Sequence, residues 1–120
     1  MLEQMTPNQI IDHVVEYYKT NSRSINDNGD CVYNGPDGAM CGFAILCENP
    51  KELPEDDIAY NLVHYGEVKL KPEFSGQSAD FYCDIQSLHD CENYWIKTPE
   101  GNELTESGII RVNKLKETYK

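Results

Sequence analysis

Two cysteines, Cys31 and Cys41, bracket a turn signal in the stretch CVYNGPDGAMC. Cysteine thiolates bind metals and attack electrophiles, whereas an unreactive buried thiol packs as a small apolar group. The chain has five cysteines, and this odd number fits poorly with a closed framework of disulfides. The chemistry open to this pair therefore depends on the histidines and carboxylates that the fold brings beside it.

One interpretation of these residues is a zinc site. Zinc takes four nitrogen or sulfur ligands in a tetrahedron. The candidate ligands in this chain are Cys31, Cys41, His89 and Cys91. Nine residues separate the first two, against about two to four in a zinc knuckle, and a single residue separates the last two. Because this spacing is unusual, we expect no metal and no other cofactor, and zinc stays the alternative.

A second interpretation makes Cys41 a nucleophile. A thiol at a helix N-terminus has a lowered pKa and attacks as the thiolate. His89 would serve as its base and would be oriented by Asp90 or by Asp84. The residue types are present, but no local signature of a thiol enzyme surrounds them. The sequence therefore favours a protein that is not an enzyme and leaves a thiol enzyme as an alternative.

The interpretation that the sequence favours needs no ligand. Residues 31–41 form a β-hairpin whose loop centres on Pro36, so that Cys31 and Cys41 lie opposite each other. We expect both thiols to be reduced, buried and close together, with no metal between them. The helix that carries His89 packs against this hairpin and gives its buried polar groups their partners.

Two motifs, the hairpin and the helix that clamps it, carry this structural interpretation. Asp37 and Gly38 make the turn. Gln86, His89 and Asp90 supply the clamp through hydrogen bonds to the hairpin backbone. The residues with a structural role are Cys31, Tyr33, Asp37, Gly38, Cys41, Gln86, His89, Asp90 and Trp95.

Helical patterns in the sequence predict the elements that carry these groups. The expected helices are 6–20, 54–65, 78–91 and 105–118, each boundary within about 2–4 residues. Thr6, Ser78 and Thr105 are good N-caps, Pro54 suits a first helical position, and Gly66 suits a helix end. With the hairpin near residues 31–41, these helices predict a small, mostly helical α+β fold in a single domain, residues 1–120.

Two shorter stretches complete the pattern. Residues 42–47, GFAILC, are expected to form a short buried helix or strand, and Gly42 would allow a close backbone approach at its start. Residues 97–103, KTPEGNE, have the composition of a loop.

The charge of the chain is strongly negative, with 21 acidic and 10 basic residues and a net charge of −11. Such a field repels nucleic acid and anionic membranes and attracts basic protein surfaces, so direct nucleic acid binding is not expected. The acidic segment from Glu48 to Asp57 is expected to lie exposed and to carry part of a partner interface. Its candidate binding residues are Glu48, Glu52, Glu55, Asp56 and Asp57.

The chain shows no sign of a membrane segment. No stretch approaches the ~18 apolar residues of a membrane span, and MLEQMTPNQI lacks the basic and apolar regions of a signal peptide. We therefore expect a cytoplasmic protein with reduced thiols. The sequence does not predict an oligomeric state.

The cysteine pair also belongs to a longer pattern. CVYNGPDGAMCGFAI resembles the motif C-[LV]-Y-x-x-P-D-G-x-x-C-x-x-G of a group of small uncharacterised proteins from phages and bacterial genomes. DIQSLHD, followed by Trp95, resembles the group's second motif, D-L-Q-x-[IL]-H-D with a later Trp. The likeness spans about residues 10–96 and departs from the pattern at 42–46, where the usual glycine is not in place. It implies a phage or bacterial origin and adds no reaction, because the group has no assigned activity.

Together these features predict a small acidic phage-type protein that binds a host protein with a basic surface and inhibits or modulates it. An anti-defence role, or mimicry of the charge of nucleic acid, fits this prediction because carboxylates compete for sites that hold phosphates. The alternative is a thiol- or metal-dependent enzyme, or a pocket that captures a small nucleotide-like ligand.

Overall fold

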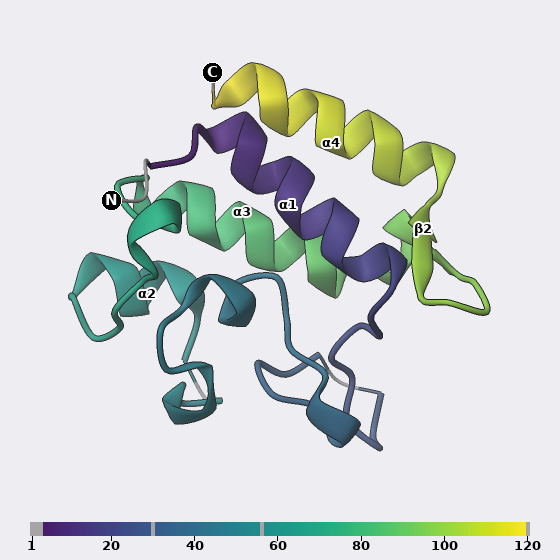
Figure 1. The fold of residues 1–120 in the computed structure, drawn as a ribbon, viewed down its shortest axis with the longest axis horizontal. Coiled ribbons are helices and arrows are strands. Elements are labelled where there is room, and N and C mark those ends of the chain that lie inside the picture. Colours follow the sequence, from purple (N-terminus) through teal and green to yellow (C-terminus); the bar gives the residue numbers. More distant parts are fainter. Residues whose placement is uncertain (1–3, 30, 56, 120) are drawn as a thin grey trace.

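The computed structural model describes residues 4–29, 31–55 and 57–119. Within these ranges the chain forms four α-helices and one two-stranded antiparallel sheet (Figure 1), which confirms the small, mostly helical α+β fold. The elements are α1 (Pro7–Lys19), α2 (Ala59–His64), α3 (Ala79–Asp90), β1 (Trp95–Lys97), β2 (Asn102–Leu104) and α4 (Glu106–Thr118). None of the helices in the described ranges is long and apolar enough to cross a membrane.

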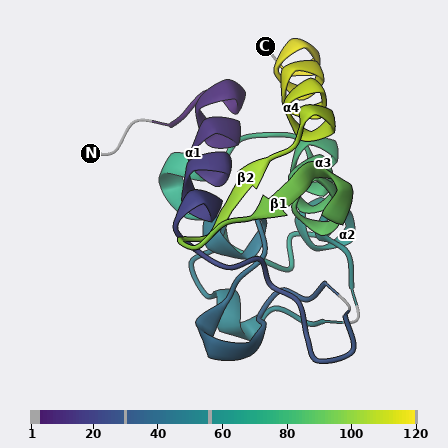
Figure 2. The ribbon, with the colours of Figure 1, turned by 90° about the vertical axis from the view of Figure 1, so that its right-hand side faces the viewer.

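The three longer helices α1, α3 and α4 pack against one another, and the two strands lie between α1 and α3 in the view of Figure 2. In both views the chain between α1 and α2 lies on the side of the molecule opposite α4. This irregular segment therefore forms one side of the molecule, and α4 lies on the opposite side.

Local capping explains why three helices begin where the sequence predicts. The Thr6 side chain accepts a hydrogen bond from Gln9, whose side chain accepts one from the Thr6 backbone, which makes a capping box for α1. The hydroxyls of Ser78 and Thr105 likewise accept backbone N–H groups at the starts of α3 and α4. The predicted ranges 6–20, 78–91 and 105–118 are confirmed within the stated margin.

The second helix is shorter than its predicted range of 54–65, because it begins at Ala59. Residues before it make other contacts: the Glu55 carboxylate accepts the backbone N–H of Tyr33, and the Tyr33 hydroxyl donates to the Asp57 carbonyl. These contacts hold the chain out of the helical conformation. The predicted end is confirmed, since Gly66 has a φ of 67° and the following backbone turns back onto the last helical carbonyls.

The regular β-hairpin lies outside the segment in which it was expected. Strand β1 pairs with β2 in the register Trp95 with Leu104, Ile96 with Glu103 and Lys97 with Asn102. The prediction of a loop over residues 97–103 is therefore wrong for Lys97, which ends β1, and for residues 102–103, which begin β2. It is right for residues 98–101, which connect the two strands. Three-residue strands are too short to show an alternating pattern in the sequence.

Residues 31–41 do turn back on themselves, but in another register. Asn34 pairs with Met40, and the backbone N–H of Cys41 donates to the Tyr33 carbonyl, so Tyr33 lies opposite Cys41. Cys31 pairs instead with Ile25. The predicted pairing of the two cysteines is wrong because the turn over Pro36–Gly38, with a φ of 78° at Gly38, is centred one residue later than expected.

The stretch after Cys41 fills the centre of the molecule. Residues 44–46 form a short 3-10 helix, and all residues from 41 to 47 are buried. A Cβ atom at Gly42 would lie 3.3 Å from atoms of both Ile85 and Val14, so the glycine lets this stretch approach α1 and α3 closely. Both predictions for residues 42–47 are confirmed.

Candidate functional site

His89, the residue before the last in α3, is a fully buried side chain with a partner at each ring nitrogen. Its Nε2 lies 2.9 Å from the backbone nitrogen of Ser24, and its Nδ1 lies 2.7 Å from Oδ1 of Asp90. A backbone N–H can only donate, so Nε2 accepts and the ring proton belongs on Nδ1, which donates to Asp90. Burial lowers the pKa of His89, while Asp90 opposes this shift and the charge of Arg23 adds to it. The imidazole is therefore held neutral in one tautomer.

Arg23, the residue before Ser24, caps the C-terminal end of α3. Nε and Nη2 of Arg23 both donate to the His89 carbonyl, at 2.9 and 2.6 Å. A cation at this position interacts favourably with the negative end of the α3 dipole. The thiol of Cys31 donates to the neighbouring carbonyl of Asp90 at 3.4 Å, and Nη2 of Arg23 lies 4.0 Å from Cys31 Sγ. Two loop segments are thus fixed to one helix terminus.

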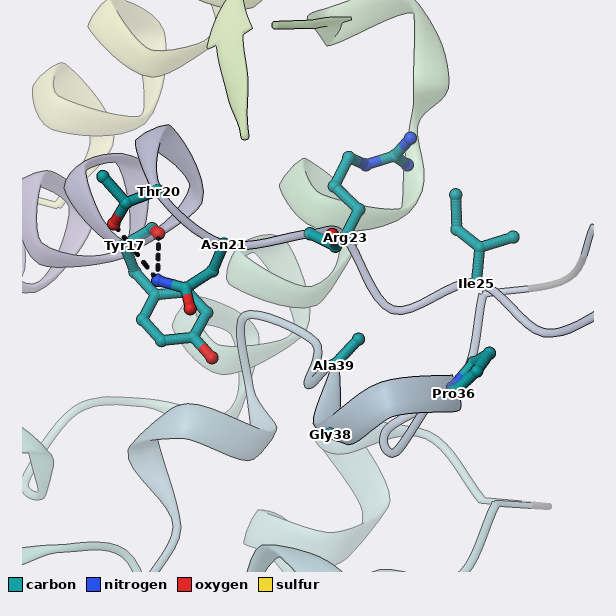
Figure 3. A pocket seen from close by; sticks show the side chains of 9 residues that line it. Tyr17, Thr20, Asn21, Arg23, Ile25, Pro36, Gly38 and Ala39 are labelled. Carbon is teal, nitrogen blue, oxygen red and sulfur yellow. Dashed lines mark hydrogen bonds between the residues drawn. The ribbon is translucent and has the colours of Figure 1, made fainter. Parts of the chain in front are cut away.

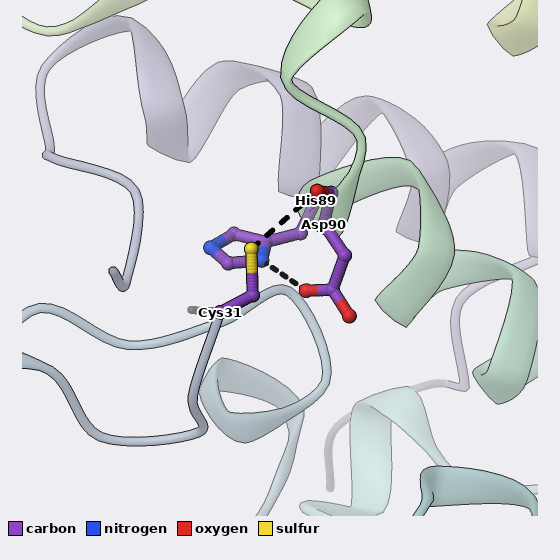
Figure 4. A group of neighbouring side chains, drawn as sticks. All are labelled: Cys31, His89 and Asp90. Atoms are coloured by element: carbon purple, nitrogen blue, oxygen red, sulfur yellow. Dashed lines mark hydrogen bonds and ion pairs between the residues drawn. The ribbon is translucent and has the colours of Figure 1, made fainter. Parts of the chain in front are cut away.

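Figure 4 shows that Cys31, His89 and Asp90 form a cluster, and their possible ligand atoms lie within 4.8 Å of one another. The donor chemistry does not fit a metal cation. Both imidazole nitrogens are engaged with the Ser24 amide and Asp90, and the guanidinium of Arg23 places a positive charge beside the sulfur. Within the described ranges the cluster includes neither Cys41 nor Cys91, so the predicted set of four zinc ligands is not assembled.

The nucleophile interpretation also finds no support at Cys41. Its side chain is 1% exposed, and burial raises the pKa of this thiol to about 12. The Cys41 sulfur accepts the backbone N–H of Ala44 rather than facing a base. His89 cannot serve as that base because its acceptor nitrogen already holds the Ser24 N–H. Cys41 is therefore an unreactive core thiol.

The remaining motif residues hold neighbouring segments together. Gln86 accepts the backbone N–H of Ala59 and so fixes the start of α2, and its side chain also hydrogen-bonds with the side chain of Tyr33, whereas the sequence predicted a bond to the hairpin backbone. Trp95 donates its indole N–H to the Leu88 carbonyl. Asp37 and Gly38 lie in the turn, as predicted. The second motif does hold the first, but mainly through Arg23 and Ser24, which sequence analysis missed because no local pattern marks them.

The predicted acidic binding residues divide into two kinds. Glu48 and Glu52 are exposed, as expected. Glu55 is exposed too, but its carboxylate accepts the backbone N–H groups of both Tyr33 and Asn34, at 2.6 and 3.1 Å, so it has a structural role that the sequence did not predict. Asp57 is half-buried and accepts the N–H of Ile58. Asp56 lies outside the described residues.

Exposed apolar and aromatic side chains follow this acidic segment in the sequence. Tyr65 is 70% and Ile58 52% exposed, and the His64 ring contacts the rings of both Tyr60 and Tyr65. Glu52 and Glu67 line one cavity of about 210 Å³. The surface formed by Glu48, Glu52, Ile58, Tyr60, His64, Tyr65 and Glu67 is called the acidic face below.

Two further cavities flank residues 22–25. One, of about 390 Å³, lies against the 31–41 turn, where Pro36 and Ala39 line it (Figure 3). The other, of about 530 Å³, lies against the β1–β2 hairpin and is lined by Trp95 and Lys97. Arg23 contributes to the walls of both.

Comparisons with known proteins do not assign this site. No protein-family model, no curated protein and no solved structure matches the chain. The resemblance to small phage and bacterial proteins therefore stays a prediction from the two sequence motifs.

Proposed function

We propose that the protein acts by binding a partner protein with a basic surface, and that the acidic face is the binding site. The observation that carries this proposal is the exposure of Tyr65, 70%, at the end of the helix that follows the most acidic stretch of the chain. Large exposed aromatic side chains are frequent anchors at protein interfaces. An isolated exposed apolar residue would need no explanation, but Tyr65 adjoins His64 and Tyr60 in one aromatic group.

The charge around this aromatic group specifies the kind of partner. Between residues 48 and 67 the chain has six carboxylates and one lysine. Glu55 and Asp57 accept hydrogen bonds from the backbone, and Glu48 pairs with Lys69 at 3.6 Å. Glu52 and Glu67 make no ion pair within the described ranges, although both line the same cavity. These two carboxylates, in a cavity that Lys69 also lines, would attract a lysine or arginine side chain from a partner.

This chemistry suits a partner that normally holds phosphates, because carboxylates compete for the same basic groups. We propose a phage-encoded protein that binds such a host protein in the cytoplasm and inhibits or modulates it. Net charge supports this mode of action further, since a protein of charge −11 associates faster with a basic partner at low salt.

Site-specific photo-crosslinking in bacterial cells tests the proposal. A photoreactive phenylalanine derivative is placed at Tyr65 on the acidic face or, as a control, at Ile110 on α4, which is 62% exposed. We expect one basic protein to be crosslinked from position 65 and not from position 110. Equal crosslinking from both positions, or none from position 65, contradicts the proposal.

Charge variants make the test specific. Glu52→Gln with Glu67→Gln removes two carboxylates that have no structural bond in the described ranges, and should abolish the crosslink from position 65. Glu100→Gln with Glu103→Gln removes two exposed carboxylates near the hairpin and should leave the crosslink intact. If both pairs reduce it equally, only net charge matters and the acidic face is not the site.

A further inference from the structure

The cavity of about 530 Å³ beside the β1–β2 hairpin, called the hairpin cavity below, is separate from the acidic face. Three segments form it: residues 22–25, residues 92–97, and residues 101–102 at the start of β2. Its volume falls within the range of about 300–1,000 Å³ that is typical of small-molecule sites. The cavity is therefore large enough for one small ligand.

The charge of this cavity is opposite to that of the protein as a whole. Arg23 and Lys97, two of only ten basic residues in the chain, line it together with a single carboxylate, Glu92. Arg23 is held in place because its Nε and Nη2 donate to the His89 carbonyl. Figure 3 shows its guanidinium extended away from Pro36 and Ala39, the turn residues of the smaller cavity. A fixed cation and an exposed lysine together favour an anionic group.

Apolar and amide groups complete the lining. Trp95 is held in place because its indole N–H donates to the Leu88 carbonyl, and it is 6% exposed, so only a small part of the indole lines the cavity. Half-buried Ile25 also lines the cavity. Flat rings pack favourably against such side chains. Asn93 is exposed at the same cavity, and its amide can both donate to and accept from the edge of a heterocycle.

We propose that the hairpin cavity binds a nucleoside monophosphate. Its phosphate would lie between Arg23 and Lys97, and its base would lie against Ile25 and the exposed part of Trp95, with Asn93 at the ring edge. This ligand combines the anionic group and the flat heterocycle that the lining favours. The proposal does not depend on protein binding at the acidic face, because the two sites share no residues.

Calorimetric titration with AMP, combined with tryptophan fluorescence, tests the proposal. Trp95 is the only tryptophan in the chain, so any change in tryptophan emission comes from the cavity lining. We expect saturable binding of AMP, with a change in Trp95 emission, and at least about tenfold weaker binding of adenosine and of inorganic phosphate. Absence of saturable AMP binding overturns the proposal, as does equal affinity for either fragment.

Matched lysine variants locate the site. Lys97 is exposed and makes no ion pair in the described ranges, so Lys97→Gln should fold normally and weaken AMP binding about fivefold. Lys114→Gln removes an exposed charge from α4 and should leave the affinity unchanged. Unchanged affinity in Lys97→Gln, or an equal loss in both variants, overturns the assignment of the cavity. Circular dichroism of each variant confirms that the fold is retained.

Discussion

His89 and Ser24 are joined by a buried hydrogen bond of 2.9 Å in which the imidazole accepts the backbone N–H. The two residues are 65 positions apart in sequence, and both side chains have no exposed surface. The bond fixes the protonation state of the ring and the position of the segment that leads into the 31–41 turn. The first two predictions follow from this contact.

Removal of the imidazole should destabilise the protein strongly. His89→Ala leaves a cavity and a buried Ser24 N–H without an acceptor, so we expect a loss of about 3 kcal/mol in the free energy of unfolding. Urea denaturation followed by circular dichroism measures it. His64→Ala serves as the control, because this exposed histidine should change stability by less than about 0.5 kcal/mol. A similar loss of unfolding free energy in both variants would show that the buried hydrogen bond between His89 and Ser24 contributes little to stability.

Stability should fall in mild acid because of the same ring. The pKa of His89 is lowered in the folded state, whereas the unfolded imidazole titrates near 6.5, so acid protonates the unfolded chain first. The contribution of neutral His89 is therefore complete above about pH 6.5 and is lost as the pH falls below it. Urea denaturation at about pH 7.5 and about pH 5.5 should show a smaller difference in His89→Gln than in the wild type. An equal difference would assign the acid sensitivity to other groups, such as His13, whose pKa is also lowered by burial.

The cysteines should differ in reactivity according to burial. Burial raises the pKa of Cys41 and of Cys47 to about 12, and both side chains are 1% exposed. Iodoacetamide should therefore label neither of them in the folded protein, while part-exposed Cys91 is labelled. Mass spectrometry of the native and the urea-unfolded protein distinguishes the sites, and labelling of Cys41 in the native protein would contradict the fold.

Removal of the Cys41 thiol tests the alternative interpretation in which this residue binds zinc. Cys41→Ala should cost about 1–2 kcal/mol through a small cavity. A chelator should leave the melting temperature of the wild type and of this variant unchanged. A drop in the wild-type melting temperature on addition of the chelator would instead indicate a structural metal.

Glu55 should differ from its acidic neighbours in its effect on folding. Its two carboxylate oxygens accept the backbone N–H groups of Tyr33 and Asn34, so Glu55→Ala should cost about 1–3 kcal/mol. Glu52→Ala should change stability by less than about 0.5 kcal/mol, because its charge is solvated. Thermal melts of the two variants compare them directly. Equal melting temperatures would show that the contacts of Glu55 contribute little.

The sequence predicted the features that depend on neighbouring residues. Thr6, Ser78 and Thr105 cap the helices that follow them, and Gly66 ends α2, because each acts within one turn of its own position. The start of α2 was missed because Glu55 is held by a partner 22 residues away. Such a contact leaves no local pattern.

The sequence likewise predicted only part of the candidate site. The proximity of Cys31 to Asp90 is consistent with the predicted clamp between the two motifs. The partners that hold His89 were not foreseen, because a buried backbone N–H such as that of Ser24 has no signature in residue type. The predicted register of the 31–41 turn was wrong because the centre of the turn depends on the backbone conformation of Gly38. The rules that pair residues across a hairpin do not predict this conformation.

The attachment of Arg23 and Ser24 to His89 also bears on the order of folding. These contacts close a chain segment of 65 or 66 residues, and closing so long a loop costs entropy before any contact compensates for it. The helices, which form through local contacts, should therefore precede the docking of residues 23–41. In native-state hydrogen exchange, the Ser24 amide should then open at a lower free energy than the amides at the centre of α3.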